Sequence, residues 1–186
     1  MAQHGRAAAG VPGLSVVIPT LGRPILVQTL RSLMQTRGAD GLEVLVVGRL
    51  ADPAVAAAFA VLRRAHPCIR HLDVRFASGD SSRKKNAGWQ AARAELVAFL
   101  DDDVVVAPDW PEAIVAPFAR TEVGLVSGPG LVPDDLPLMA RLAGSALASP
   151  AAGYVAARYR PGGDPYPAPW SRLIGCNMAF RRSVLE

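Results

Sequence analysis

Short apolar runs alternate with amphipathic segments through the first hundred residues of the chain. The apolar runs are rich in valine, leucine and isoleucine, and we predict buried strands over residues 14–18, 42–47, 68–76 and 96–100. Helical spacing of apolar residues, or a proline that opens an alanine-rich stretch, predicts helices over residues 23–36, 53–64 and 83–93. This alternation predicts an α/β fold with a single doubly wound, mostly parallel sheet and helices on both faces.

The second half of the chain has a less regular pattern. We predict a helix, a strand and a second helix over residues 109–119, 123–127 and 136–148. Residues 149–170 are rich in proline, glycine and alanine and predict a long loop, a kind of segment that often contributes to binding. No internal repeat or long linker divides the chain, so we expect a flexible tail over residues 1–13 and one domain over residues 14–186.

Three consecutive carboxylates, Asp101, Asp102 and Asp103, follow the apolar run 96–100 and precede the apolar run 104–106. Like charges packed at the end of a buried strand repel one another unless a positive group lies among them. Mg²⁺ or Mn²⁺ is the simplest candidate, because these ions prefer carboxylate oxygen and keep open positions for phosphate. The alternative is a solvated acidic turn.

The two lysines of the chain lie together in a basic segment, beside an arginine. Arg83 and either Lys84 or Lys85 are candidates to neutralise phosphate, and Asn86 is a candidate to donate a hydrogen bond to a nucleotide. Gly88 permits a close approach of backbone or ligand. The alternative is the basic first turn of an ordinary surface helix, although cations at that end oppose the helix dipole.

Four segments follow one another in a definite order. They are Val16-Val17-Ile18-Pro19-Thr20 with Arg23, Arg83-Lys84-Lys85-Asn86-Ala87-Gly88, Phe99-Leu100-Asp101-Asp102-Asp103, and Gly175-Cys176-Asn177-Met178-Ala179-Phe180-Arg181-Arg182. In this order they resemble the opening strand and turn, the basic Asn-Gly segment, the Asp-x-Asp metal motif and the acceptor-side strand of the family 2 glycosyltransferases, which use nucleotide sugars and share the GT-A fold. A lone Asp-x-Asp motif is common by chance. Four motifs in the order of this family, from residue 14 to the end, make the resemblance specific.

The resemblance implies a role for particular residues. The implied donor-binding residues are Pro19, Thr20, Arg23, Arg83, Asn86, Asp101 and Asp102. The implied metal ligands are Asp103 and Asp101, with Mg²⁺ or Mn²⁺ as cofactor. On the acceptor side the implied residues are Trp170, Gly175, Cys176 and Asn177, with Trp170 as a sugar-stacking candidate. Pro19 is equally explained as the end of a strand, Thr20 as a helix cap and Trp170 as a lid on the core.

Two departures from the family pattern concern acidic residues. Relatives usually carry an acid just after the second strand for the nucleotide base, whereas Arg49 follows Gly48 here, and Asp52 is a possible substitute. The family's catalytic base lies in a Glu-Asp motif that this sequence lacks; Asp134, Asp135 and Asp164 do not match it by context. We therefore expect the base beyond Glu186, in a chain that is a fragment or a natural truncation.

Composition and charge narrow the choice of partners. The sequence has 51% hydrophobic and 19% charged residues and a formal charge of +4, but its basic residues are mostly scattered arginines, so we do not expect a nucleic-acid partner. No apolar run is long enough for a membrane span. Cys68 and Cys176 form no metal or disulfide motif, which favours a cytoplasmic location; peripheral association with the inner face of the membrane stays open.

The function that these observations predict is metal-dependent, inverting transfer of a sugar from a nucleotide-diphosphate donor to a polysaccharide, lipid-linked or small-molecule acceptor. The lack of a recognisable base leaves open a second interpretation, a non-catalytic nucleotide-sugar-binding module of a larger assembly. A nucleotidyltransferase also uses carboxylate-bound Mg²⁺, but that class usually opens with a glycine-rich phosphate loop, which residues 19–22 do not form.

Overall fold

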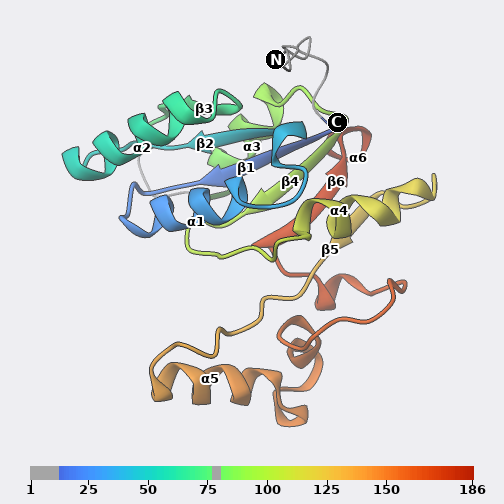
Figure 1. Ribbon diagram of the computed structural model, residues 1–186. Coiled ribbons are helices and arrows are strands. Elements are labelled where there is room, and N and C mark those ends of the chain that lie inside the picture. Colours follow the sequence, from blue (N-terminus) through green and yellow to red (C-terminus); the bar gives the residue numbers. More distant parts are fainter. Residues whose placement is uncertain (1–12, 77–80) are drawn as a thin grey trace, which may run out of the picture.

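The strands form one sheet in the computed structural model, which describes residues 13–76 and 81–186 (Figure 1). They are β1 Leu14–Pro19, β2 Leu42–Val47, β3 Ile69–Leu72, β4 Leu96–Leu100, β5 Leu125–Ser127 and β6 Asn177–Arg181. The strand order across the sheet is β3-β2-β1-β4-β6-β5. Strands β1 to β4 pair in parallel, whereas β6 runs antiparallel to both β4 and β5. The predicted mostly parallel α/β sheet is confirmed.

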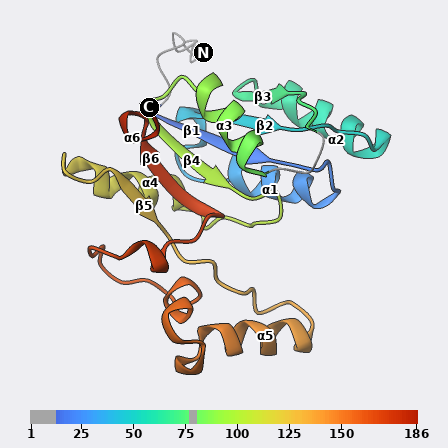
Figure 2. The ribbon, with the colours of Figure 1, turned by 180° about the vertical axis from the view of Figure 1, so that it is seen from behind.

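Helices cover both faces of the sheet because the side chains of its central strands alternate between two apolar clusters. Val16 and Ile18 of β1 pack on the side of α1 (Ile25–Met34), α2 (Pro53–Ala65) and α4 (Trp110–Val115). Val17 packs on the opposite side, toward α3 (Ser81–Ala91) and the short α6 (Arg182–Leu185) (Figure 2). This two-sided burial accounts for the mostly apolar runs from which the central strands are predicted.

Between β5 and β6 the chain leaves the sheet and forms a separate helical segment (Figure 1). This segment contains α5 (Leu138–Ala148) and two 3₁₀ helices, η3 (Pro150–Arg158) and η4 (Trp170–Arg172). Only Gly144 of α5 is buried, and Leu138 and Met139 are 66% and 75% exposed. Among the described residues, no helix combines the length and the apolarity that crossing a membrane requires.

Prolines and turns account for most differences between the predicted and observed elements. The helix predicted over 109–119 divides into α4 and the 3₁₀ helix η2 (Ala116–Ala119), because Pro117 has no N–H to continue the α-helical hydrogen bonds. The loop predicted over 149–170 contains η3, which begins at Pro150. The strand predicted over 68–76 is limited to β3. Residues 1–12 of the predicted tail lie outside the described residues; the N–H of Gly13 donates to Gly41 O at 3.1 Å.

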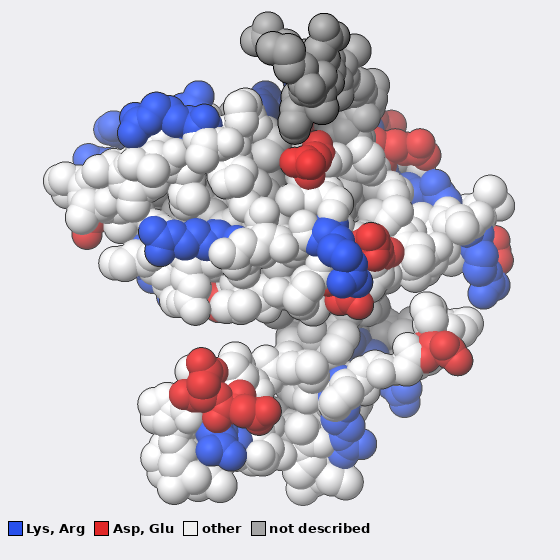
Figure 3. Space-filling model, viewed as in Figure 1, with Lys and Arg blue, Asp and Glu red and all other residues white. Residues whose placement is uncertain are grey.

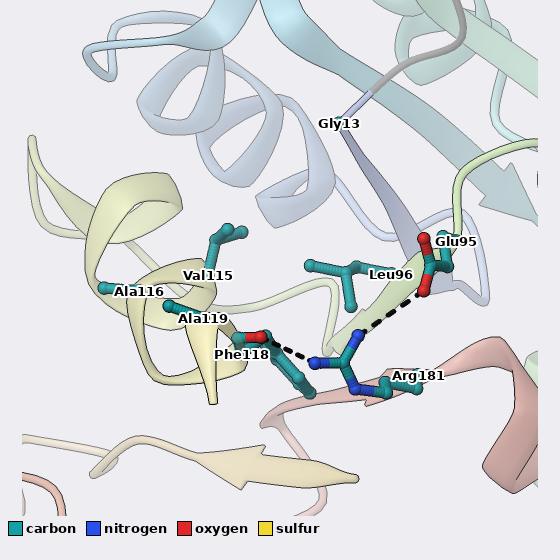
Figure 4. Close-up of a pocket in the computed structure, with 8 residues that line it drawn as sticks. All are labelled: Gly13, Glu95, Leu96, Val115, Ala116, Phe118, Ala119 and Arg181. Atoms are coloured by element: carbon teal, nitrogen blue, oxygen red, sulfur yellow. Dashed lines mark hydrogen bonds and ion pairs between the residues drawn. The ribbon is translucent and has the colours of Figure 1, made fainter. Parts of the chain in front are cut away.

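A cavity of about 460 Å³ lies near the start of β4 (Figure 4). The three aspartates follow the other end of this strand. The Arg181 side chain extends into the cavity from β6 and donates to Phe118 O at 2.6 Å. It also donates to Val123 O and reaches the carboxylate of Glu95 at 3.4 Å. These bonds join β6 to the segment around η2 and to the beginning of β4, so Arg181 has a structural role there.

Acidic and basic side chains are interspersed over the face of the molecule drawn in Figure 3. This distribution follows from the scattered arginines of the sequence, many of which pair with a nearby acid. Arg37 lies close to Asp109 and Glu112, for example, and Arg120 pairs with Glu122 at 2.8 Å.

Candidate functional site

The ends of β1 and β4 form the walls of a smaller cavity of about 180 Å³. It is lined by Pro19, Thr20, Leu21, Arg23, Ser81, Lys84, Asp101, Asp102 and Asp103. The two strands are parallel neighbours, with Val17 opposite Phe99, so the loops that follow them meet at one edge of the sheet. The chain continues from β1 to one side, through β2 and β3, and then returns to β4 on the other side. Such a reversal of strand order opens a crevice where α/β proteins commonly bind ligands.

Thr20 connects the first strand to the acidic segment. Its hydroxyl donates to Asp102 Oδ2 at 2.6 Å and accepts from the N–H of Gly22 at 2.9 Å. Its own N–H donates to Val47 O, which fixes the loop against β2. Thr20 does not cap α1, because the N-cap residue of that helix is Pro24. The hydroxyl therefore orders the acidic turn instead of a helix end.

The three carboxylates have different environments. Asp102 is 4% exposed, and it accepts hydrogen bonds from Thr20 and from the guanidinium of Arg23. The side chains of Asp101 and Asp103 remain 42% and 49% exposed. Lys85 Nζ lies 3.5 Å from Asp101 Oδ1, and Arg23 Nη2 lies 3.1 Å from Asp103 Oδ2. The middle aspartate thus holds the turn together, while the outer two present oxygen atoms at the surface.

The donor set at this edge fits a hard divalent cation that completes its coordination with other ligands. Within residues 13–76 and 81–186 no three Asp, Glu, His or Cys side chains converge on one metal position. Two partly exposed carboxylates, Asp101 and Asp103, nevertheless flank the cavity. Mg²⁺ commonly binds through one or two carboxylates and takes its remaining ligands from water and substrate phosphates. The site therefore fits a cation that binds together with a phosphate-bearing ligand.

Helix α3 contributes a buried lysine that sequence reasoning did not single out from its neighbours. A Cβ on Gly88 would lie 2.2 Å from Val17 Cγ1, so only glycine allows this helix to pack so closely on β1. Lys84, one turn earlier on the same face, is 6% exposed and donates to Thr20 O at 2.8 Å. The spacing of four residues between this lysine and a glycine was the available signal. Its ammonium group supplies positive charge beside the cavity.

The other predicted donor-side residues of α3 face solvent. Arg83 is exposed and its guanidinium lies over the ring of Phe76, 5.9 Å from the centroid. Asn86 is also exposed. Neither residue lines the cavity, whereas Pro19, Thr20, Arg23 and the three aspartates do.

Among the predicted acceptor-side residues, Gly175 and Cys176 lie near the aspartates, whereas Trp170 does not line the cavity. Lys85 Nζ donates to Gly175 O at 2.9 Å, which holds the segment before β6 close to Asp101. Burial raises the pKa of the Cys176 thiol, and the charge of Asp101 raises it further. In contrast, Trp170 is 81% exposed on η4 and does not line the cavity.

Asn177 has its side-chain amide engaged by the protein itself. Its Oδ1 accepts from the indole N–H of Trp110 at 2.9 Å, and its Nδ2 donates to Pro129 O at 3.0 Å. Trp110 is 7% exposed and belongs to the core. The amide therefore anchors the beginning of β6 between α4 and the segment that follows β5.

Asp52 serves as the N-cap of α2, and Arg49 is exposed in the loop before it. The Asp52 carboxylate accepts from the N–H of Ala54 at 2.7 Å and of Val55 at 3.4 Å. This is the common way to satisfy free N–H groups at a helix start. This capping role explains the acid at position 52 without any role in binding a nucleotide base.

Replacement of Asp52 by alanine is expected to lower the free energy of unfolding by about 1 kcal/mol, because two N–H groups of α2 lose their acceptor. Asp52→Asn should restore most of the loss, since asparagine caps equally well. Urea unfolding followed by circular dichroism measures both changes. A full loss in Asp52→Asn would show that the carboxylate charge, and not the cap, matters.

The aspartates considered as catalytic bases lie elsewhere. Asp134, Asp135 and Asp164 are exposed residues of the segment between β5 and β6, and none of them lines the cavity.

Comparison with known proteins finds a matching family model and a curated relative. The model of the family described as "Glycosyl transferase family 2" matches residues 15–186. A curated relative, the succinoglycan biosynthesis protein ExoM of Rhizobium meliloti (strain 1021), is 30% identical over 118 residues, which are 62% of this chain and 38% of the relative.

Two solved structures share the fold. The mannosyltransferase PcManGT from Pyrobaculum calidifontis, in complex with GDP-Man and Mn²⁺, matches with a TM-score of 0.61 and 21% identity over 95% of this chain and 46% of its own. TarS (residues 1–349) from S. aureus matches with a TM-score of 0.61 and 14% identity over 92% of this chain and 48% of its own. The fold is GT-A, and this chain spans less than half the length of each of these three proteins.

Proposed function

Because the chain belongs to glycosyl transferase family 2, we propose that it binds a nucleotide-diphosphate sugar in the cavity at the ends of β1 and β4 and transfers the sugar to an acceptor hydroxyl. The observation that carries this proposal is the meeting of two partly exposed carboxylates, Asp101 and Asp103, with the buried ammonium of Lys84 around one cavity. Phosphate groups and a divalent cation are the ligands that balance such a set of charges.

The reaction proposed is a direct displacement that inverts the anomeric carbon. The acceptor oxygen forms a bond to that carbon while the bond to the diphosphate breaks, and its electron pair leaves with the diphosphate. The hydroxyl proton passes to a base, and we assign that role to none of the aspartates considered above. Lys84 and Arg23 would stabilise the negative charge that develops on the leaving diphosphate.

A divalent cation, Mg²⁺ or Mn²⁺, would be held by Asp103 and Asp101 and would supply charge to the leaving diphosphate. The complex of the structural neighbour PcManGT with GDP-Man and Mn²⁺, and that of TarS with UDP-GlcNAc, support a nucleotide-diphosphate sugar as the donor here. Pro19 and Thr20 would contact the donor from β1, while Arg83 and Asn86 would reach it from the exposed side of α3.

The acceptor proposed is a polysaccharide, a lipid-linked saccharide or a small molecule that approaches from the side of Gly175, Cys176 and Asn177. The name of the curated relative, a succinoglycan biosynthesis protein, supports a role in polysaccharide synthesis. The exposed apolar side chains of α5 support a lipid-linked acceptor and peripheral contact with a membrane. Trp170 would then offer its exposed ring to a sugar.

A second candidate is a non-catalytic module that binds the nucleotide sugar without transferring it. The position of Asp134, Asp135 and Asp164 outside the cavity favours this alternative for the described part of the chain. Release of nucleoside diphosphate distinguishes the two candidates, because only an active transferase breaks the anomeric bond.

A thermal-shift screen tests donor binding directly. The protein is heated with UDP-, GDP- and dTDP-sugars, each with Mn²⁺, with Mg²⁺ or with EDTA. A donor at 100 times its Kd should raise Tm by about 5 to 10 °C, because it stabilises only the folded state, and EDTA should remove most of that shift. Nucleoside monophosphates serve as matched controls, since they lack the second phosphate. Absence of any metal-dependent shift across the panel would contradict the proposal.

A further inference from the structure

The guanidinium of Arg23 lies beside Asp103, one of the two carboxylates that we propose as metal ligands. Its Nη2 contacts Asp102 Oδ1 and lies 3.1 Å from Asp103 Oδ2, so one positive group bridges two acids. The short turn through Gly22, whose N–H donates to the Thr20 hydroxyl, directs Arg23 from β1 toward β4. In the described structure the negative charge of Asp103 is thus already paired.

The two partners of Arg23 are held differently. Asp102 is buried and has a second anchor in the Thr20 hydroxyl at 2.6 Å, and Thr29 donates to its backbone oxygen at 2.9 Å. The side chains of Asp103 and Arg23 are each about half exposed, at 49% and 50%. The contact between Arg23 and Asp103 is therefore the weaker of the two, since exposed ion pairs contribute little to stability. Arg23 can leave Asp103 while Asp102 stays in place.

A divalent cation and a guanidinium compete for the same carboxylate oxygen. A cation approaching Asp103 alone meets the positive charge of Arg23, which raises the free energy of the complex. A cation that arrives with a diphosphate brings negative charge of its own, so the repulsion by Arg23 is offset.

We propose that Arg23 occupies Asp103 in the donor-free protein and thereby makes metal binding depend on the donor. This inference rests on the proposed function and adds an order of binding to it. The linkage is reciprocal: if the diphosphate strengthens metal binding, the metal strengthens diphosphate binding by the same factor.

The test measures Mn²⁺ binding by electron paramagnetic resonance, which detects the free ion and needs no turnover. Wild type, Arg23→Gln, Arg23→Lys and the control Arg31→Gln are titrated with Mn²⁺ alone and with Mn²⁺ plus UDP or GDP. Arg31 is an exposed arginine of α1 that does not line the cavity, so its replacement makes the same change in net charge.

Arg23→Gln should bind Mn²⁺ alone about three to ten times more tightly than wild type, because one exposed ion pair and its repulsion are lost. The strengthening of Mn²⁺ binding by the nucleoside diphosphate should shrink by a similar factor. Arg23→Lys should lie between wild type and Arg23→Gln, since a single ammonium does not bridge two carboxylates as a planar guanidinium does. Arg31→Gln should match wild type.

Equal Mn²⁺ affinity and equal coupling in wild type and Arg23→Gln would overturn the inference while leaving the proposed function intact. The same gain in Arg31→Gln would also overturn it, because net charge alone would then be responsible. The proposed function fails together with the inference if neither wild type nor Arg23→Gln binds Mn²⁺, either alone or with a nucleoside diphosphate. Circular dichroism and urea midpoints verify that each variant is folded. If Arg23→Gln does not fold, the comparison of wild type with Arg23→Lys tests the inference.

Discussion

Replacement of Glu43 by alanine is expected to lower the free energy of unfolding by about 3 kcal/mol, the largest effect on stability that we expect from a single polar residue of the sheet. Glu43 lies on β2 with a side chain that is 0% exposed. Its carboxylate accepts from the Ser15 hydroxyl at 2.6 Å and from Arg93, through N at 2.8 Å and Nε at 2.8 Å. Arg70 of β3 is a further partner.

The loss would be large because the substitution leaves several donors without an acceptor. The Ser15 hydroxyl is buried and also accepts from the N–H of Ala94, so this group cannot turn to water. The two arginines are 37% and 63% exposed and recover part of their solvation, which places the effect at the lower end of the range for broken buried ion pairs. Urea unfolding measures the change.

Glu122→Ala is the matched control for this experiment. Glu122 pairs with Arg120 at 2.8 Å, but both side chains are more than 60% exposed. Its loss should change the free energy of unfolding far less than the loss of Glu43, because exposed ion pairs contribute little to stability. Similar losses in the two variants would contradict a special role for the buried carboxylate.

The stability contributed by Glu43 should also depend on pH. Burial raises the pKa of Glu43, but hydrogen bonds from Ser15, Arg93 and Arg70 outweigh burial and hold the pKa below its ordinary value. Because the folded-state pKa is lowered, the contribution is complete above the unfolded pKa of about 4.3 and is lost as pH falls through the folded pKa. The difference in stability between wild type and Glu43→Gln should be constant from pH 7 to pH 5 and shrink below that range.

Asp103→Ala is expected to weaken Mn²⁺-dependent binding of a nucleoside diphosphate by about 10- to 100-fold or more. Losses of this size are found even when the replaced residue only supports a metal ligand. Asp103 follows β4 with its carboxylate half exposed beside the cavity, and its pair with Arg23 is a surface contact. The variant should therefore fold normally and lose mainly the metal-dependent part of the Tm shift.

Asp109→Ala provides the comparison for Asp103. Asp109 lies in the same connection between β4 and α4, and its side chain is 56% exposed beside Arg37 at 3.9 Å. Nucleoside diphosphate with Mn²⁺ should raise the Tm of this variant as it does for wild type. An unchanged Mn²⁺-dependent shift in Asp103→Ala would remove this residue from the proposed metal site.

The central strands could be predicted closely because their signal is local. Residues 42–47 and 96–100 are buried on both faces, so 96–100 reads as an unbroken apolar run and 42–47 as a nearly unbroken one, and β2 and β4 have these bounds. Glu43 interrupts the first run. The sequence shows that interruption but not its cause, because Ser15, Arg70 and Arg93 come from other parts of the chain.

The position of β6 could not be predicted from local pattern. Its pairing with β4 and β5 depends on contacts between residues far apart in the sequence, such as Leu100 with Asn177. The same limit applies at the site. Three adjacent aspartates look equivalent in the sequence, whereas Thr20 and Arg23 turn Asp102 inward and leave Asp101 and Asp103 exposed. Lys84 differs from Lys85 only through the helix face that it occupies.

The insertion of β6 between β4 and β5 affects how the nascent chain acquires its structure. On the ribosome, where about 5 to 20 residues are added per second, the first four strands are complete well before residues 177–181 emerge. During that interval of several seconds the outer edge of β4 has no partner among the described strands, and neither has β5. Exposed strand edges favour association between chains, so a chaperone that shields this edge during translation should increase the yield of folded protein.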